Sequence, residues 1–233
     1  MNLPGAPSLL FLGYLLVGLP LAARQTARRL RNTDRLRAIS RERYWRSAVI
    51  AQVLLLTLAL IAGSTFDYAI FGGEITASDI LAGFGGLALC LGVRLLSLRA
   101  RTKSELRSLS VYRLSPRTPT ELAWFLGAVT AASIAEEAAY RGVGWAILAE
   151  ASGSGWFATV VLSMAFVLAH WHQGRKSGLA ILGLALIMHV LVAITQTLLV
   201  AMAVHAAYDL IVAYRIAKQA RLFDEEVCGQ VPA

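Results

Sequence analysis

The chain has 233 residues, of which 57% are hydrophobic and only 15% charged, and its formal net charge is +8. Soluble domains carry about 25% charged residues, so the composition argues against a single water-soluble core and favours a chain dissolved in lipid. The positive charge alone would also suit nucleic-acid binding, but the positions of the basic residues argue against that function.

Seven apolar stretches are candidates for membrane helices, which need about 17–25 residues to span a bilayer. In chain order they cover about residues 5–23, 47–64, 78–97, 122–149, 156–171, 178–194 and 198–216. The first has no basic residue before its apolar run and Arg24 directly after it, the reverse of a signal peptide. The sequence therefore predicts an all-α membrane bundle of about seven transmembrane helices.

The basic residues alternate between the connections of this bundle. Nine of the 22 Lys and Arg lie between Arg24 and Arg46, seven between Arg94 and Arg117, two at 175–176 and three at 215–221. The connections 64–77, 151–155 and 195–197 have none. Since basic residues accumulate on the cytoplasmic side, we predict an outer N-terminus and a cytoplasmic C-terminus. We expect the basic loops to contact anionic lipid and not nucleic acid.

Ionisable side chains are rare inside membranes and mark functional sites there, yet several interrupt the later spans. The fourth span is long and polar at its middle, and the fifth, sixth and seventh also carry such residues. They are Glu136, Glu137 and Arg141 in AEEAAYRG, His170 in FVLAHWH, His189, and His205 and Asp209 in AVHAAYD.

Helical spacing sorts these residues. Glu137 and Arg141 are four apart, which predicts an ion pair on one helix face. Glu136 points about 100° away on the same helix and lacks that partner, so we expect it to be free for chemistry. His205 and Asp209 share one face of their helix.

Depth brings these groups together. At 1.5 Å rise per residue, Glu136 and His170 each lie roughly 21 Å below the outer surface, His205 roughly 10 Å and Asp209 roughly 16 Å. We therefore predict a polar site in the cytoplasmic half of the bilayer. We expect His172 and His189 to be packing residues instead.

Three motifs carry a family resemblance. EEAAYR fits EExxxR, FVLAH fits FxxxH and HAAYD fits HxxxN/D, in the right order over residues 115–215. The chain thus resembles the CPBP family, the CAAX prenyl endopeptidase and bacteriocin-processing group, also called Abi or glutamic-type intramembrane proteases. The resemblance implies that Glu136 activates water, that Glu137 and Arg141 brace it, and that His170, His205 and Asp209 complete the site.

We predict one membrane domain over residues 1–233, of which the resemblance covers about residues 115–215. Its parts would be three N-terminal spans with basic cytoplasmic loops (1–114), a catalytic core (115–217) and a cytoplasmic tail (218–233). Because many members have Asn where Asp209 stands, and Asp donates no hydrogen bond unless protonated, the role of Asp209 stays open.

The predicted activity is endopeptidase cleavage of a membrane-anchored protein or peptide. Glu136, helped by His170, would deprotonate water, and His205 would stabilise the oxyanion. Zinc held by Glu136, His170 and His205 is the competing hypothesis, but HExxH is absent and we favour a reaction without metal or other cofactor.

Two other classes of function remain as alternatives: a proton-coupled carrier, since intramembrane Glu, His and Asp also form proton relays, and a non-catalytic immunity or scaffold protein. A carrier is expected to show inverted repeats, and none is visible. The compact chain and its Arg-rich loop favour a multi-pass protein of a bacterial inner membrane.

Overall fold

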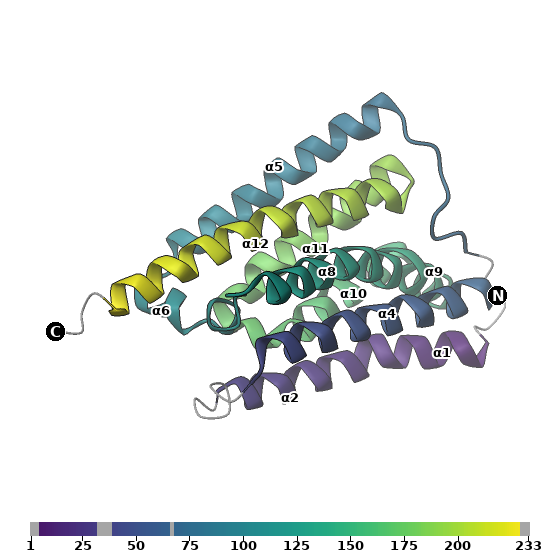
Figure 1. Ribbon diagram of the computed structural model, residues 1–233. Helices are drawn as coiled ribbons and strands as arrows, with labels where there is room; N and C mark the ends of the chain where they lie inside the picture. Colours follow the sequence, from purple (N-terminus) through teal and green to yellow (C-terminus); the bar gives the residue numbers. More distant parts are fainter. Residues whose placement is uncertain (1–4, 32–38, 66–67, 229–233) are drawn as a thin grey trace.

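The computed structural model describes residues 5–31, 39–65 and 68–228, and within these ranges the chain is helical without strands. The helices form one bundle of roughly aligned rods (Figure 1). The N-terminal rod comprises α1 (Ala6–Gly13), η1 (Tyr14–Gly18) and α2 (Leu19–Arg31). It is followed by α4 (Arg41–Thr65) and α5 (Ala77–Arg99), and then by two short helices, α6 (Lys103–Ser108) and α7 (Ser110–Arg113).

The C-terminal half holds the remaining rods. A long central rod joins α8 (Pro119–Glu136), the π-helix η2 (Glu137–Val143) and α9 (Gly144–Ser152). It is followed by α10 (Gly155–Ala169), the 3₁₀ turn η3 (Trp171–Gln173), α11 (Arg175–Thr195) and α12 (Leu198–Cys228).

Six helical stretches among the described residues are long and apolar enough to cross a membrane, and α10 is a shorter apolar helix. With 15 residues, α10 is about 22 Å long, which is less than the about 30 Å of a hydrocarbon core. The predicted all-α membrane bundle is confirmed, but the fifth predicted span is shorter than a full crossing. The orientation of the termini stays a prediction.

Most helices extend beyond the apolar stretches that predicted them. The first rod continues to Arg31 and α12 to Cys228, because Arg, Lys and Glu are good helix formers and hydropathy marks only the part suited to lipid. Packing supports the extension of α12, whose Ile216, Ala220 and Phe223 are buried together with Tyr112 of α7. The N-terminus of α8 is set by a capping box between Thr118 and Glu121.

The rod α8–η2–α9 lies at the centre, where α8 packs against α4 and α12, and α9 packs against α10. Helix α11 packs against α5, α10 and α12. Large apolar side chains point outwards, among them Leu10, Leu81, Trp156 and Leu179, each more than 70% exposed. Such a surface suits lipid and not water.

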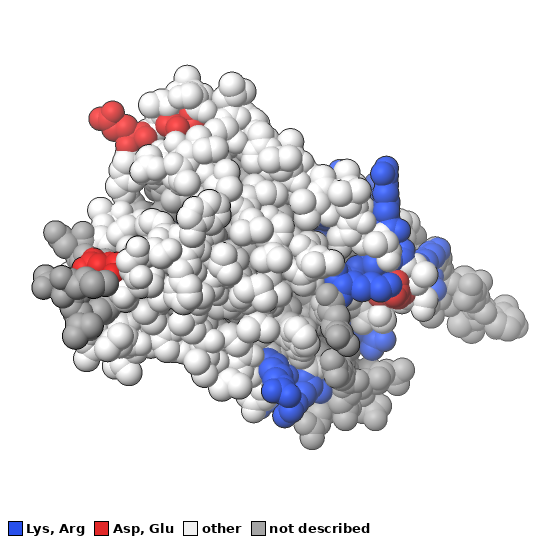
Figure 2. Space-filling model, turned by 180° about the vertical axis from the view of Figure 1, so that it is seen from behind, with Lys and Arg blue, Asp and Glu red and all other residues white. Residues whose placement is uncertain are grey.

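Charge is divided between the two ends of the bundle. Figure 2 shows Lys and Arg gathered at the end where α6 and the end of α12 lie, with an acidic side chain among them, and the other Asp and Glu of this face at the opposite end. The polarity has the sense that the sequence predicts for a cytoplasmic C-terminus. Arg35 and Arg37 of the first basic connection lie outside the described residues.

Candidate active site

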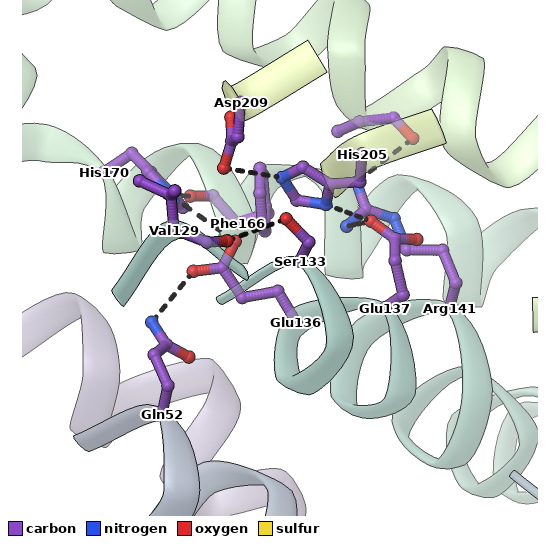
Figure 3. A network of polar contacts seen from close by, with 11 residues as sticks. Gln52, Val129, Ser133, Glu136, Glu137, Arg141, Phe166, His170, His205 and Asp209 are labelled. Atoms are coloured by element: carbon purple, nitrogen blue, oxygen red, sulfur yellow. Dashed lines mark hydrogen bonds and ion pairs between the residues drawn. The ribbon is translucent and has the colours of Figure 1, made fainter. Parts of the chain in front are cut away.

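The two adjacent carboxylates lie where α8 passes into the π-helix η2. Glu136 is the last residue of α8, Glu137 is the first of η2, and all seven residues of η2 are buried. A π-helix inserts one extra residue into a helical turn and occurs frequently at functional sites. The two side chains point to different neighbours, Glu136 towards Gln52 and Glu137 towards His205 (Figure 3).

Glycine allows this segment to form. The N–H of Gly144 donates to the carbonyl of Ala139, the i→i+5 bond of the π-helix. A Cβ at Gly144 would lie 2.4 Å from that carbonyl oxygen and 2.8 Å from the side chain of Leu15. A Cβ at Gly142 would lie 2.7 Å from the side chain of Leu198. A side chain larger than hydrogen is therefore excluded at Gly144 by the backbone, whereas at Gly142 it would require the side chain of Leu198 to shift.

Glu137 is a structural carboxylate whose charge is compensated. Its Oε1 accepts a hydrogen bond from Arg141 Nη1 at 3.1 Å, and its side chain and that of Arg141 are 0% and 1% exposed. Nδ1 of His205 lies 2.7 Å from the same oxygen. The predicted Glu137–Arg141 ion pair is thus present, and it holds His205 of α12 in place.

Arg141 also ties the pair to two other helices. Its Nη2 donates to the carbonyl of Ala185 on α11 at 3.4 Å. Its guanidinium carbon lies 4.5 Å from the centroid of the Phe166 ring on α10, within range of a cation–π interaction. One buried cation therefore joins the central rod to α10 and α11.

Glu136 has different partners. Gln52 Nε2 of α4 donates to its Oε1 at 3.1 Å, and His170 Nε2 lies 3.9 Å from its Oε2. Among the described residues no Lys or Arg forms an ion pair with Glu136. The carboxylate is buried, at 8% exposure, and has no compensating cation in contact.

His170 is oriented by the end of α10. The last carbonyls of a helix lack helical partners, and the carbonyl of Phe166 lies 2.8 Å from His170 Nδ1. Since a carbonyl only accepts, Nδ1 carries the proton, and in neutral His170 the lone pair is on Nε2, the atom that faces Glu136. A gap of 3.9 Å between two acceptors suits a bridging water that donates to both.

His205 stands between two carboxylates. Its Nδ1 faces Glu137, and its Nε2 lies 3.6 Å from Asp209 Oδ2, one turn along α12. The structure thus places His205 beside Glu137 rather than beside Glu136. If Nδ1 donates to Glu137, Nε2 carries a proton only in the cationic ring, and Asp209 then forms an ion pair with it.

A cavity of about 390 Å³ connects these groups to one end of the bundle. Its wall includes Glu136, His170, His205 and Asp209, and it continues to Arg101, to residues 109–112 and to Leu114. This is the end that carries the basic residues (Figure 2). The apolar side chains of the wall suit a largely apolar ligand.

Two polar contacts lie at the end of the cavity near Arg101. One joins α6 to the start of α11, and the other joins Arg101, which precedes α6, to Ser177 of α11. Lys176 Nζ donates to Glu105 Oε1 at 2.5 Å, and Arg101 Nη2 donates to Ser177 at 2.9 Å. The hydrogen bond from Lys176 holds the pKa of the Glu105 carboxyl below its ordinary value. These contacts fix the short helices at this end of the cavity.

The remaining histidines differ from the site residues. His172 lines the cavity, with its ring stacked 6.1 Å from that of His170. His189 is buried on α11, and its Nε2 has no hydrogen-bond partner. Neither contacts Glu136.

The residue that the sequence analysis missed is Gln52. It is a lone amide in the apolar run AVIAQVLLL, and an average hydropathy over the span conceals it. A search for single polar residues in predicted spans would have found it.

The described residues form no cluster of three or more His, Cys, Asp or Glu that could hold a metal ion. The proposed zinc set fails at His205, whose two ring nitrogens face Glu137 and Asp209. Only Glu136 and His170 of that set have donor atoms directed at each other. The residues present therefore do not fit the tetrahedral site that zinc requires.

Fold and site together define a multi-pass membrane protein with a buried centre of carboxylates and histidines. Residues 118–211 match the model of a family described as Rce1-like, type II CAAX prenyl endopeptidase. The match contains all three motifs and confirms the resemblance seen in the sequence. At the level of the family it indicates a CAAX protease, a peptide hydrolase of membranes. No curated protein and no solved structure was found to match the chain.

Proposed function

We propose that the protein is an intramembrane endopeptidase of the glutamic type, which cleaves a membrane-anchored protein or peptide by means of a water activated by Glu136. The observation that supports this most is the 3.9 Å gap between Glu136 Oε2 and the unprotonated Nε2 of His170. A water donating to both acceptors would direct a lone pair of its oxygen away from them, towards a substrate carbonyl.

The water oxygen forms a bond to the carbonyl carbon while one water proton moves to Glu136. His205, whose two ring nitrogens face Glu137 and Asp209, would stabilise by its positive charge the oxygen on which negative charge develops. Protonated Glu136 then delivers its proton to the leaving nitrogen, the C–N bond breaks, and the products are a carboxylic acid and an amine.

The substrate is expected to reach the site from the membrane and the water from the basic end of the bundle, which we take to be cytoplasmic. Basic residues there would bind anionic lipid. The cavity is too small for a whole helical span, since a helix is about 10–12 Å wide, so the segment around the scissile bond would enter unwound. The localisation proposed is a bacterial inner membrane.

The experiment compares membrane proteomes of cells that contain the wild-type protein or Glu136→Ala. The variant should accumulate an unprocessed precursor that the wild type converts. Equal processing by both proteins would overturn the proposal, and loss of proton flux without a processing defect would favour a carrier.

Metal analysis of the active purified protein tests the metal-free mechanism. Stoichiometric zinc whose removal abolishes cleavage would refute that mechanism.

A further inference from the structure

Helix α4 contributes a polar residue to the site although it lies outside the segment matched by the family model. Gln52 donates from Nε2 to Glu136 Oε1 at 3.1 Å across 84 positions of the sequence. It also lines the cavity that contains His170 and His205. Its side-chain contact is with Glu136, which forms no ion pair with Lys or Arg among the described residues.

The geometry fixes which oxygen of Glu136 is free. Gln52 occupies Oε1, while Oε2 is the oxygen that faces His170 Nε2. If the contact with Gln52 were lost, the carboxylate could rotate and neither oxygen would be held against the water position. Catalysis depends on such orientation, since small displacements of a catalytic group reduce rates strongly.

The other end of the amide is unused. Gln52 Oε1 is buried and has no hydrogen-bond partner. The NH₂ group is therefore the part of the amide that contacts the site. Glu136 alternates between carboxylate and carboxylic acid in the proposed reaction, and only the acid has an O–H to donate.

We propose that Gln52 is a positioning residue that serves both protonation states of Glu136. Its NH₂ group donates to Oε1 of the carboxylate before the reaction. After the water proton has moved to Oε2, the same group donates to Oε1 as the carbonyl oxygen of the carboxylic acid, so that Oε2 stays directed at the substrate. This inference rests on the proposed function of Glu136.

The test uses purified protein in phospholipid vesicles. Gln52→Met keeps the length of the side chain and removes both donor and acceptor, whereas Gln52→Ala leaves space for a water that can replace the donor. Thr57→Val on the same helix is the matched control, because Thr57 is exposed and bonds only the carbonyl of Val53.

The first measurement is the infrared carboxyl band of Glu136, identified by its absence in Glu136→Gln. We expect this band to shift in Gln52→Met, to shift less in Gln52→Ala and to stay unchanged in Thr57→Val. An identical band in Gln52→Met and wild type would overturn the inference, whatever the substrate is.

The second measurement is hydrolysis of a pool of quenched-fluorescence peptides that carry a farnesyl or palmitoyl anchor. We expect kcat to fall about tenfold or more in Gln52→Met, as for loss of a hydrogen bond to a charged group, with KM within twofold. If Gln52→Met is fully active while Glu136→Gln is inactive, the inference about Gln52 is overturned and the proposed function of Glu136 still holds. Activity of Glu136→Gln would instead overturn the proposed function.

Discussion

At the scale of residues, the two neighbouring glutamates have opposite surroundings. Glu137 is fully buried with its charge shared between Arg141 and His205, whereas Glu136 contacts an amide and an imidazole. A carboxylate held by a buried cation is poorly placed to take up a proton. The contrast assigns stability to Glu137 and chemistry to Glu136.

Glu137→Gln should therefore act mainly on stability. Removing one partner of a buried ion pair leaves Arg141 uncompensated, which costs about 3–5 kcal/mol. Thermal unfolding in detergent should show a clearly lower Tm for Glu137→Gln. Glu136→Gln is the matched control and should unfold near the wild-type temperature, since it breaks no ion pair with Lys or Arg. Equal Tm values for the two variants would contradict the assignment.

His170→Ala should act on the chemical step. Its Nε2 lies 3.9 Å from Oε2 of Glu136, and loss of a group that assists proton transfer lowers rates by about 10²–10⁴-fold. The rate of precursor cleavage in vesicles measures this. His172→Ala, which removes a cavity-lining ring without contact to Glu136, should retain most activity. A His170→Ala rate within threefold of wild type would contradict the role.

Much of the site could be predicted from the sequence because ionisable residues are conspicuous among apolar ones. The Glu137–Arg141 pair follows from helical spacing, and the common depth of Glu136 and His170 follows from helical rise. The contact of His205 with Glu137 could not be predicted, since it depends on how α12 packs against the central rod. Gln52 could not be assigned to Glu136 for the same reason.

At the scale of elements, the π-helix η2 determines where the carboxylates point. An extra residue in one turn leaves no trace in hydrophobic periodicity when the whole segment is buried, as residues 137–143 are. The sequence therefore predicted one continuous span there. The long central rod and its polar middle were visible, but the change of helix type was not.

Gly144→Ala tests the importance of η2. The added methyl would meet the carbonyl of Ala139, which belongs to the backbone and cannot move without disrupting the turn. Overpacking of this kind costs about 1–3 kcal/mol, so both Tm and cleavage rate should fall. Gly85→Ala on α5 is the control, because its Cβ would have nothing within 4 Å. A Gly144→Ala protein with wild-type stability and rate would contradict this view of η2.

At the scale of the whole molecule, the bundle brings α4, the central rod, α10, α11 and α12 around one buried centre. The helical class and the approximate spans were predictable, because bilayer thickness sets the length of apolar runs. The fifth predicted span, residues 156–171, was already shorter than the roughly 17 residues that a crossing needs. The extension of α12 was not predictable, since its contacts with α7 lie beyond the apolar run. The charge polarity of the two ends agrees with the orientation inferred from the basic loops.

Labelling of single cysteines tests that orientation. In a Cys228→Ala background, Ala77→Cys should react with a membrane-impermeant thiol reagent added to intact cells, and Ser104→Cys should react only after the cells are opened. Both positions are exposed, at opposite ends of the bundle, and the remaining Cys90 is buried. The reverse pattern of labelling would place the basic end outside.

The central claim is that Glu136 activates the water that cleaves a peptide bond inside the membrane. The most direct measurement uses the precursor that accumulates in cells containing Glu136→Ala. The precursor is incubated with purified wild-type protein in vesicles prepared in ¹⁸O-labelled water, and the product is analysed by mass spectrometry. The account predicts a cleaved product with ¹⁸O in its new terminal carboxylate, and no product with Glu136→Gln. Cleavage at the wild-type rate by Glu136→Gln would contradict it.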